Sequence, residues 1–156
     1  IEYSAGSARR FIGVECKYAE NLAATSINVR DVYTDFTKSS GLWQADASTR
    51  LNEKKLRQFW LNTLLAQSLA TRPTNNYESG ISVIVACAAD ASAHAATDAV
   101  RAKLLEPDRW LRWSPYEQVL AAIEGQDGWK QAFTQRYLDF TPVLHLLRAD
   151  DPRRGA

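Results

Sequence analysis

The chain has 156 residues and a formal net charge of +1, with 46% hydrophobic and 24% charged residues. These values lie near the averages of folded domains, so they exclude a disordered chain, a collagen and a coiled coil. No apolar run approaches the roughly 20 residues of a membrane span, and the N-terminus lacks a signal-peptide pattern. Because the net charge offers no general attraction for polyanions, nucleic-acid binding requires a local basic patch.

The first half of the chain predicts one hairpin and two helices. Residues 1–18 alternate around a turn of small residues, which is typical of a β-hairpin. A short helix is expected over 28–38, and the polar residues 46–49 are expected to form a loop. The strongest helical pattern covers 51–71, where apolar residues recur on one face until Pro73 ends the helix.

The second half alternates strands and helices. In chain order we expect a buried strand, a helix, a short strand and two further helices, over 81–88, 92–105, 110–113, 114–123 and 129–147. This order predicts an α/β fold, a three-layer sandwich with a central mixed sheet and extra C-terminal helices. We expect one domain over 1–149 and a flexible polar tail over 150–156.

The start of the chain and its cysteines carry two further expectations. The sequence begins at Ile1 and contains no methionine, so we expect it to be part of a longer protein or to lack N-terminal residues. Cys16 and Cys87 fall inside the two most apolar strand-like segments. We expect two buried free thiols in a reducing, cytoplasmic compartment, and a disulfide is the alternative.

Glu15 and Lys17 form the one motif with an evident mechanism. In a strand they point to one face, while Cys16 points to the other. Burying a carboxylate or an ammonium among apolar residues is costly unless it is paired or bound to a metal. The carboxylate suits Mg²⁺, and the lysine suits orienting a water or stabilising charge on a phosphate. The alternative is a weak exposed ion pair, because E-x-K is a common tripeptide.

The hairpin segment 11–20 and the later helical segment 58–69 together resemble the PD-(D/E)XK nuclease superfamily, in particular its less characterised bacterial members. The resemblance covers roughly residues 1–115 and implies a restriction-endonuclease-like core. It also implies metal-dependent hydrolysis of DNA phosphodiester bonds by an endonuclease or exonuclease, with Mg²⁺ or Mn²⁺. Many members act as homodimers when they cut both strands, so the resemblance adds a homodimer as an arrangement to test.

The resemblance also assigns roles to residues. It implies that Glu15 is the metal ligand, that Lys17 is the catalytic lysine and that the backbone carbonyl of Cys16 adds a ligand. The family further needs an Asp on the preceding strand, opposite the Glu. If Tyr3 faces Arg10 or the next residue across the turn, that Asp position lies one or two residues before the start of the given sequence.

Three hypotheses stay open. In the first, the upstream Asp is present and the domain is a complete nuclease. In the second, the domain is catalytically incomplete and acts as a nucleic-acid or protein binding module. A third hypothesis is an unrelated α/β domain in which the E-x-K motif occurs by chance. Adjacent strands for Glu15 and Val83 would weaken this third hypothesis.

Five other polar residues are weaker candidates. Gln67 lies near the centre of the apolar stripe of its helix, which predicts a contact with the site or a phosphate, or else a buried amide bonded to a neighbouring backbone group. Arg57 borders that stripe and is predicted to reach the site or a DNA phosphate. Lys54 at the helix start, and Arg9 and Arg10 near the hairpin tip, are predicted to bind nucleic acid. For Arg57 and Lys54 the alternative is an ordinary solvated face.

Overall fold

The computed structural model describes residues 1–18, 21–22, 27–142 and 144. It divides the chain into two compact units, Ile1–Glu117 and Gln118–Ala156. The strands of the first unit are β1 (Glu2–Ala5), β2 (Ala8–Cys16), β3 (Ser79–Ala86) and β4 (Leu111–Pro115). Its helices are α1 (Asp31–Ser39), α2 (Ala47–Arg50), α3 (Lys54–Thr71), the 3-10 turn η1 (Pro73–Asn75), α4 (Ala91–Arg101) and α5 (Pro107–Trp110). Helix α6 (Tyr116–Ala122) crosses the boundary, and α7 (Asp127–Tyr137) belongs to the second unit.

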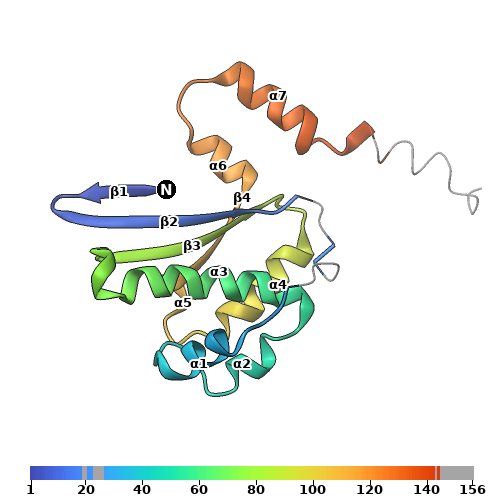
Figure 1. Ribbon diagram of the computed structural model, residues 1–156. Coiled ribbons are helices and arrows are strands. Elements are labelled where there is room, and N and C mark those ends of the chain that lie inside the picture. Colours follow the sequence, from blue (N-terminus) through green and yellow to red (C-terminus); the bar gives the residue numbers. More distant parts are fainter. Residues whose placement is uncertain (19–20, 23–26, 143, 145–156) are drawn as a thin grey trace, which may run out of the picture. The chain divides into compact units, whose positions relative to one another are not determined.

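The four strands form one mixed sheet in the order β1-β2-β3-β4 (Figure 1). Strand β1 pairs antiparallel with β2, whereas β2, β3 and β4 are parallel to one another. Parallel neighbours need long crossovers, and here these contain α1 to α3 before β3 and α4 and α5 before β4. The predicted α/β class with a central mixed sheet is therefore confirmed, and α6 and α7 follow β4 as the additional C-terminal helices.

A two-residue turn sets the register of the hairpin. Ala5 pairs with Ala8, and Gly6 between them has φ 66°, a left-handed conformation that glycine adopts without strain. Of the two registers considered from the sequence, the structure has Tyr3 opposite Arg10. The backbone groups of Ile1 and Ile12 exchange hydrogen bonds of 2.7 and 2.9 Å, which continues this pairing to the first residue.

The core of the first unit lies between the sheet and its helices. Figure 1 shows α1 to α5 on one side of the sheet, and the buried residues of α3 and β3 meet there. The stripe predicted on α3 is buried in full, namely at Leu56, Phe59, Trp60, Thr63, Leu64 and Gln67. Burying these aromatic and aliphatic side chains fixes α3 against the sheet, because removing apolar area from water is the main stabilising term.

Residues 46–49 were predicted to form a loop, and this prediction is wrong in part. Residues Ala47–Arg50 form the short helix α2, with Ala47 and Ser48 buried. Ala47 and Arg50 favour a helix whereas Ser48 and Thr49 do not, so the local preference is weak and packing against the core decides the structure.

The strand expected over 110–113 is shifted toward the C-terminus. Pro107 occupies the start of α5, which ends at Trp110, and β4 begins at Leu111. The predicted helix start at Ser114 and Pro115 is wrong, because both residues lie in β4 and α6 begins at Tyr116. Proline is tolerated here because β4 is an edge strand of the sheet.

Both cysteines are free, but the prediction that both are buried is wrong for Cys16, which is exposed. Its side chain lies on the face of β2 opposite Glu15 and Lys17, and those two face α3. Cys87 is half-buried, and burial raises the pKa of its thiol, with the carboxylate of Glu117 acting in the same direction.

The second unit contains α7, which carries an aromatic stripe. Trp129, Phe133 and Tyr137 follow one another at helical spacing, with ring centroids 5.4 and 4.9 Å apart. The predicted tail 150–156 lies outside the described residues, and the single domain 1–149 stays a prediction. Among the residues that are described, no helix combines the length and the apolar character needed to cross a membrane.

Candidate active site

The end of β2 turns Glu15 and Lys17 toward α3. Lys17 directly follows the last residue of the strand, and its backbone N–H still donates to the carbonyl of Val85 at 2.8 Å. The side chain of Lys17 is 1% exposed, whereas that of Glu15 is 25% exposed. The ammonium is thus enclosed, and the carboxylate beside it keeps access to solvent.

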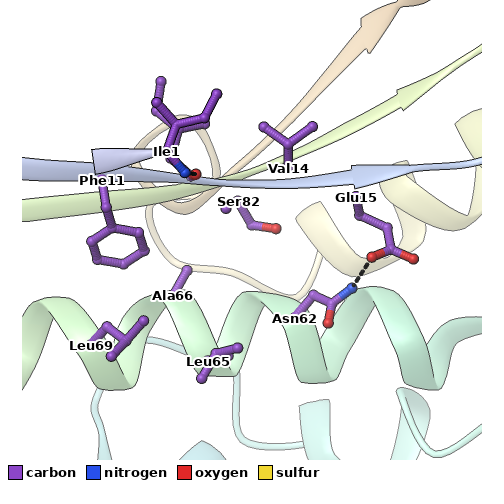
Figure 2. A pocket seen from close by; sticks show the side chains of 11 residues that line it. Ile1, Phe11, Val14, Glu15, Asn62, Leu65, Ala66, Leu69 and Ser82 are labelled. Atoms are coloured by element: carbon purple, nitrogen blue, oxygen red, sulfur yellow. Dashed lines mark hydrogen bonds between the residues drawn. The ribbon is translucent and has the colours of Figure 1, made fainter. Parts of the chain in front are cut away.

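A compact polar network holds these two charges together. Lys17 Nζ lies 2.9 Å from Glu15 Oε1 and donates to Gln58 Oε1 at 2.6 Å. The amide of Gln58 in turn donates to Glu15 Oε1 at 2.5 Å. Asn62 donates to the other carboxylate oxygen at 3.1 Å, and Figure 2 shows this contact between β2 and α3. Each oxygen of Glu15 therefore has a donor from α3.

Pairing makes the burial of Lys17 tolerable. An isolated buried ammonium is strongly unfavourable, but this one has a carboxylate and an amide oxygen within hydrogen-bond distance. The ring of Phe59 adds a further favourable contact, with its centroid 5.7 Å from Nζ. A weak exposed ion pair, the alternative considered from the sequence, does not describe this arrangement.

The strand neighbours bear on the chance-motif hypothesis. Strands β2 and β3 are adjacent and parallel, with Val14 opposite Val83 and Glu15 opposite Ile84. Glu15 and Lys17 both face α3, since both contact Gln58. Adjacent strands weaken the hypothesis of an unrelated domain with a chance E-x-K.

Gln58 and Asn62 are site residues that the sequence analysis did not single out. They lie four residues apart on α3, so they project from the same side of the helix. The apolar stripe identifies the buried face of α3, whereas the site contacts the flank of the helix that borders β2. The sequence signal that could have identified them is a pair of amide residues, four positions apart, beside the buried stripe.

Gln67 is placed elsewhere in the core. It is fully buried, and its Oε1 accepts a hydrogen bond of 2.8 Å from the indole N–H of Trp43. Nine residues separate it from Gln58, which is about 13 Å along a helix and half a turn out of phase. The structure therefore does not bring Gln67 to Glu15. The buried-amide alternative is right about its burial, but the predicted backbone partner is wrong, because the donor is the Trp43 side chain.

The basic residues of α3 do not join the network either. Arg57 donates to the backbone and side-chain oxygens of Asn52, at 2.9 and 3.0 Å, and to the carbonyl of Ile27 at 3.2 Å. It thereby ties the residues before α3 to those before α1. Lys54 lies exposed in the first turn of α3. Their contact with nucleic acid stays a prediction.

Arg9 and Arg10 lie at the other end of β2, five or six residues from Glu15, which is about 17–20 Å along a strand. Arg9 is ion-paired with Glu2 at 2.6 Å, and this contact lowers the pKa of the Glu2 carboxyl. Arg10 lies 3.7 Å from the carboxylate of Glu78. Because each arginine faces a carboxylate, their attraction for a phosphate is reduced.

The donor atoms present fit a hard divalent cation that takes few protein ligands. Ile12 directs its backbone groups toward β1 and Lys17 directs its N–H toward β3, so strand alternation points the Cys16 carbonyl to the β1 side. This carbonyl and the Glu15 carboxylate are hard oxygen ligands, and Mg²⁺ is commonly bound by one or two carboxylates with waters and phosphates. Within the described ranges, no group of three or more His, Cys, Asp or Glu residues forms a metal site.

The register also locates the position opposite Glu15. Ile1 faces Ile12, and Glu15 lies three residues further along β2. The cross-strand position is therefore three residues before Ile1, and the sequence-based count of one or two was wrong. Cross-strand partners in an antiparallel pair share a face, so a side chain at that position points toward α3, as Glu15 does.

Comparison with known families agrees with this geometry. A family model described as the PD-(D/E)XK nuclease superfamily matches residues 1–139, which include the hairpin, α3 and β3. No curated protein and no solved structure matches the chain.

Proposed function

Because the chain belongs to the PD-(D/E)XK nuclease superfamily, we propose that it hydrolyses DNA phosphodiester bonds with the help of a divalent metal ion. The observation that carries this proposal is the enclosed Lys17, held 2.9 Å from Glu15 by amides of α3. Members of this superfamily generally use divalent metals, and we propose Mg²⁺ or Mn²⁺ here.

Glu15 and the Cys16 carbonyl would hold the metal. When bound, a divalent ion supplies Lewis-acid stabilisation of a phosphate and lowers the pKa of a bound water. Glu15 provides the negative charge that attracts the ion, and its partial exposure leaves it open to the solvent side. Asn62 fixes one carboxylate oxygen from α3.

Lys17 supplies a positive charge beside the reacting phosphate. Its ammonium is pre-oriented, so it stabilises charge that develops on the phosphate without first reorganising. Gln58 is a positioning residue, because its amide oxygen accepts from Lys17 while its amide nitrogen donates to Glu15. This double contact fixes the distance between the two charges.

The test compares DNA cleavage by the full chain and by variants in Mg²⁺ and in Mn²⁺. Glu15→Gln and Lys17→Met are each expected to lower the rate about 10²–10³-fold, the usual cost of one lost electrostatic group. The exposed pair of Glu53 and Lys55, 3.9 Å apart, offers matched controls. Glu53→Gln and Lys55→Met are expected to cleave at the wild-type rate, and equal rates in all five proteins would contradict the proposal.

A binding module is the second candidate, in which the same fold is kept without catalysis. This candidate predicts that the wild-type chain binds labelled DNA, measured by fluorescence anisotropy, without cleaving it in either metal. Cleavage that disappears in Glu15→Gln would exclude it.

A further inference from the structure

A cavity of about 350 Å³ lies between β2 and α3 and reaches the candidate active site. Glu15 and Asn62 line one end of it, and mostly apolar residues line the remainder (Figure 2). Its volume lies within the range of small-molecule pockets, near the lower limit. The cavity is therefore the right size for a small part of a substrate that reacts at Glu15.

Three small residues create this space. Gly13 lies on β2 between Phe11 and Glu15, and it faces Ser82 across the pair of parallel strands. A Cβ added at Gly13 would have only the carbonyl oxygen of Ile81 within 4 Å, at 3.8 Å. Ala66 keeps the facing side of α3 equally short. The space is thus a consequence of the sequence at the place where β2 and α3 face each other.

The lining combines apolar walls with the hydroxyl group of Ser82. Phe11, Leu65 and Leu69 are apolar, and no lysine or arginine contributes to the lining. Ser82 is 2% exposed, and its side chain contributes a hydroxyl group to the lining. Figure 2 shows this hydroxyl in the space between the strands and α3. Such a lining does not suit a phosphate, but it suits a flat group with apolar faces and a polar edge.

We propose that this cavity receives an unpaired nucleobase of the DNA strand next to the phosphate that is cut. The inference rests on the proposed function and names its substrate class, single-stranded DNA or a frayed end. The base places its apolar faces against Phe11 and the leucines of α3, and its polar edge meets the Ser82 hydroxyl.

Duplex DNA does not present a base in this way. A paired base must first leave the stack, and this unpairing and unstacking costs more free energy in a duplex than in a single strand or at a frayed end. Contacts with a base face are also tolerant of sequence, because every base has one. The cavity therefore predicts a preference for strand form without a strong preference for sequence.

The test fills the cavity without touching the charged network. Gly13→Val places two methyl groups where the structure has open space, and Glu15, Lys17 and Gln58 stay unchanged. The full chain is assayed on a labelled single strand, on the same strand with one abasic position, and on a blunt duplex. Ser79→Val, on β3 and opposite Arg10 on the other face of the sheet, adds the same side chain outside the cavity and is the matched control.

Wild type and Ser79→Val are expected to cut the single strand about tenfold or more faster than the duplex, the usual scale of one base contact. In both proteins the rate of cleavage at the phosphate next to the abasic position is expected to be lower than at the same phosphate of the intact strand. Gly13→Val is expected to cut the single strand and the duplex at equal rates, and the intact and abasic strands at equal rates. Its unfolding temperature is expected to equal or exceed that of wild type. Retention of both differences in a folded Gly13→Val, or equal cleavage of the two DNA forms by wild type, would overturn the inference.

A binding measurement separates this inference from the proposed function. If wild type cleaves no DNA, the proposed function fails, and anisotropy with the same strands in Ca²⁺ still tests the cavity. Weaker binding of the abasic strand, abolished by Gly13→Val, supports a base site without catalysis. Equal binding of the intact and abasic strands by wild type would overturn the base site as well.

Discussion

At the scale of single residues, Gln58 has the most specific chemistry in the site. Its carboxamide accepts a hydrogen bond from an ammonium and donates one to a carboxylate, at 2.6 and 2.5 Å. Only an amide side chain offers an acceptor and a donor on neighbouring atoms in this way. A hydrocarbon at this position would leave both charges of the pair short of one partner each.

We expect Gln58→Leu to lower kcat about 10–100-fold, the usual cost of losing a group that orients a reacting side chain. KM is expected to change little, because Gln58 contacts the two charged residues and not the DNA itself. Steady-state cleavage assays check this, with the exposed Gln118→Leu as a matched control. A rise in KM at unchanged kcat would show that Gln58 acts in binding instead.

At the scale of elements, the contact between Trp43 and Gln67 links the segment after α1 to the C-terminal part of α3. The indole N–H of Trp43 satisfies Gln67 Oε1, but Gln67 Nε2 is buried without a hydrogen-bond partner in the described part of the chain. An unsatisfied buried donor costs free energy, so this amide stabilises the fold less than its burial would indicate.

Trp43→Phe is therefore expected to lower the free energy of unfolding by about 1–3 kcal/mol, because it leaves the Gln67 oxygen unpaired as well. The same substitution is expected to cost less in a Gln67→Leu background, where no polar group remains to be satisfied. Urea unfolding of the four proteins gives this difference as a double-mutant cycle. Equal costs in both backgrounds would show that the hydrogen bond contributes nothing.

Activity of Gln67→Leu checks the remaining prediction for this residue. Since Gln67 lies about 13 Å along α3 from Gln58, we expect DNA cleavage by Gln67→Leu at the wild-type rate. A large loss in a folded variant would instead restore the sequence-based prediction that Gln67 contacts the site.

The sequence predicted elements well where one periodic pattern decided them. The stripe of α3 depends on side-chain period and agrees with the structure, and the hairpin has one of the two registers that the sequence left open. Helix α2 depends on packing against the core, and β4 depends on its position at the edge of the sheet. Neither can be predicted from a local sequence pattern. Gln58 was missed for the same reason, since its role follows from the approach of β2 to one flank of α3.

At the scale of the whole molecule, two ion pairs connect α4 and the residues after it with other segments of the first unit. Lys103 contacts Asp46 at 2.8 Å, and Arg101 contacts Asp108 at 2.6 Å. A hydrogen bond from Lys103 lowers the pKa of Asp46, and a hydrogen bond from Arg101 lowers the pKa of Asp108. Both carboxylates are therefore more acidic in the folded chain than in the unfolded chain.

This direction predicts how stability depends on pH. A carboxyl whose pKa is lowered by folding contributes stability above its unfolded pKa, near 4, and that contribution is lost as pH falls through the folded pKa. We expect Asp46→Asn and Asp108→Asn to reduce the difference in unfolding midpoint between neutral and acidic pH. Urea unfolding at pH 7 and pH 3 checks this, with the exposed Asp35→Asn as control. An unchanged difference in both variants would contradict it.

The alternation of β2 has a practical consequence for measuring this protein. Cys16 is exposed on one face of the strand, while the residues on either side of it point into the polar network. Burial raises the pKa of the Cys87 thiol, so that thiol has little reactive thiolate at neutral pH. A maleimide fluorophore is therefore expected to label Cys16 first, with one label per chain by mass spectrometry. Such a dye is expected to report binding of the proposed metal or DNA from one peptide unit away, with the network left in place.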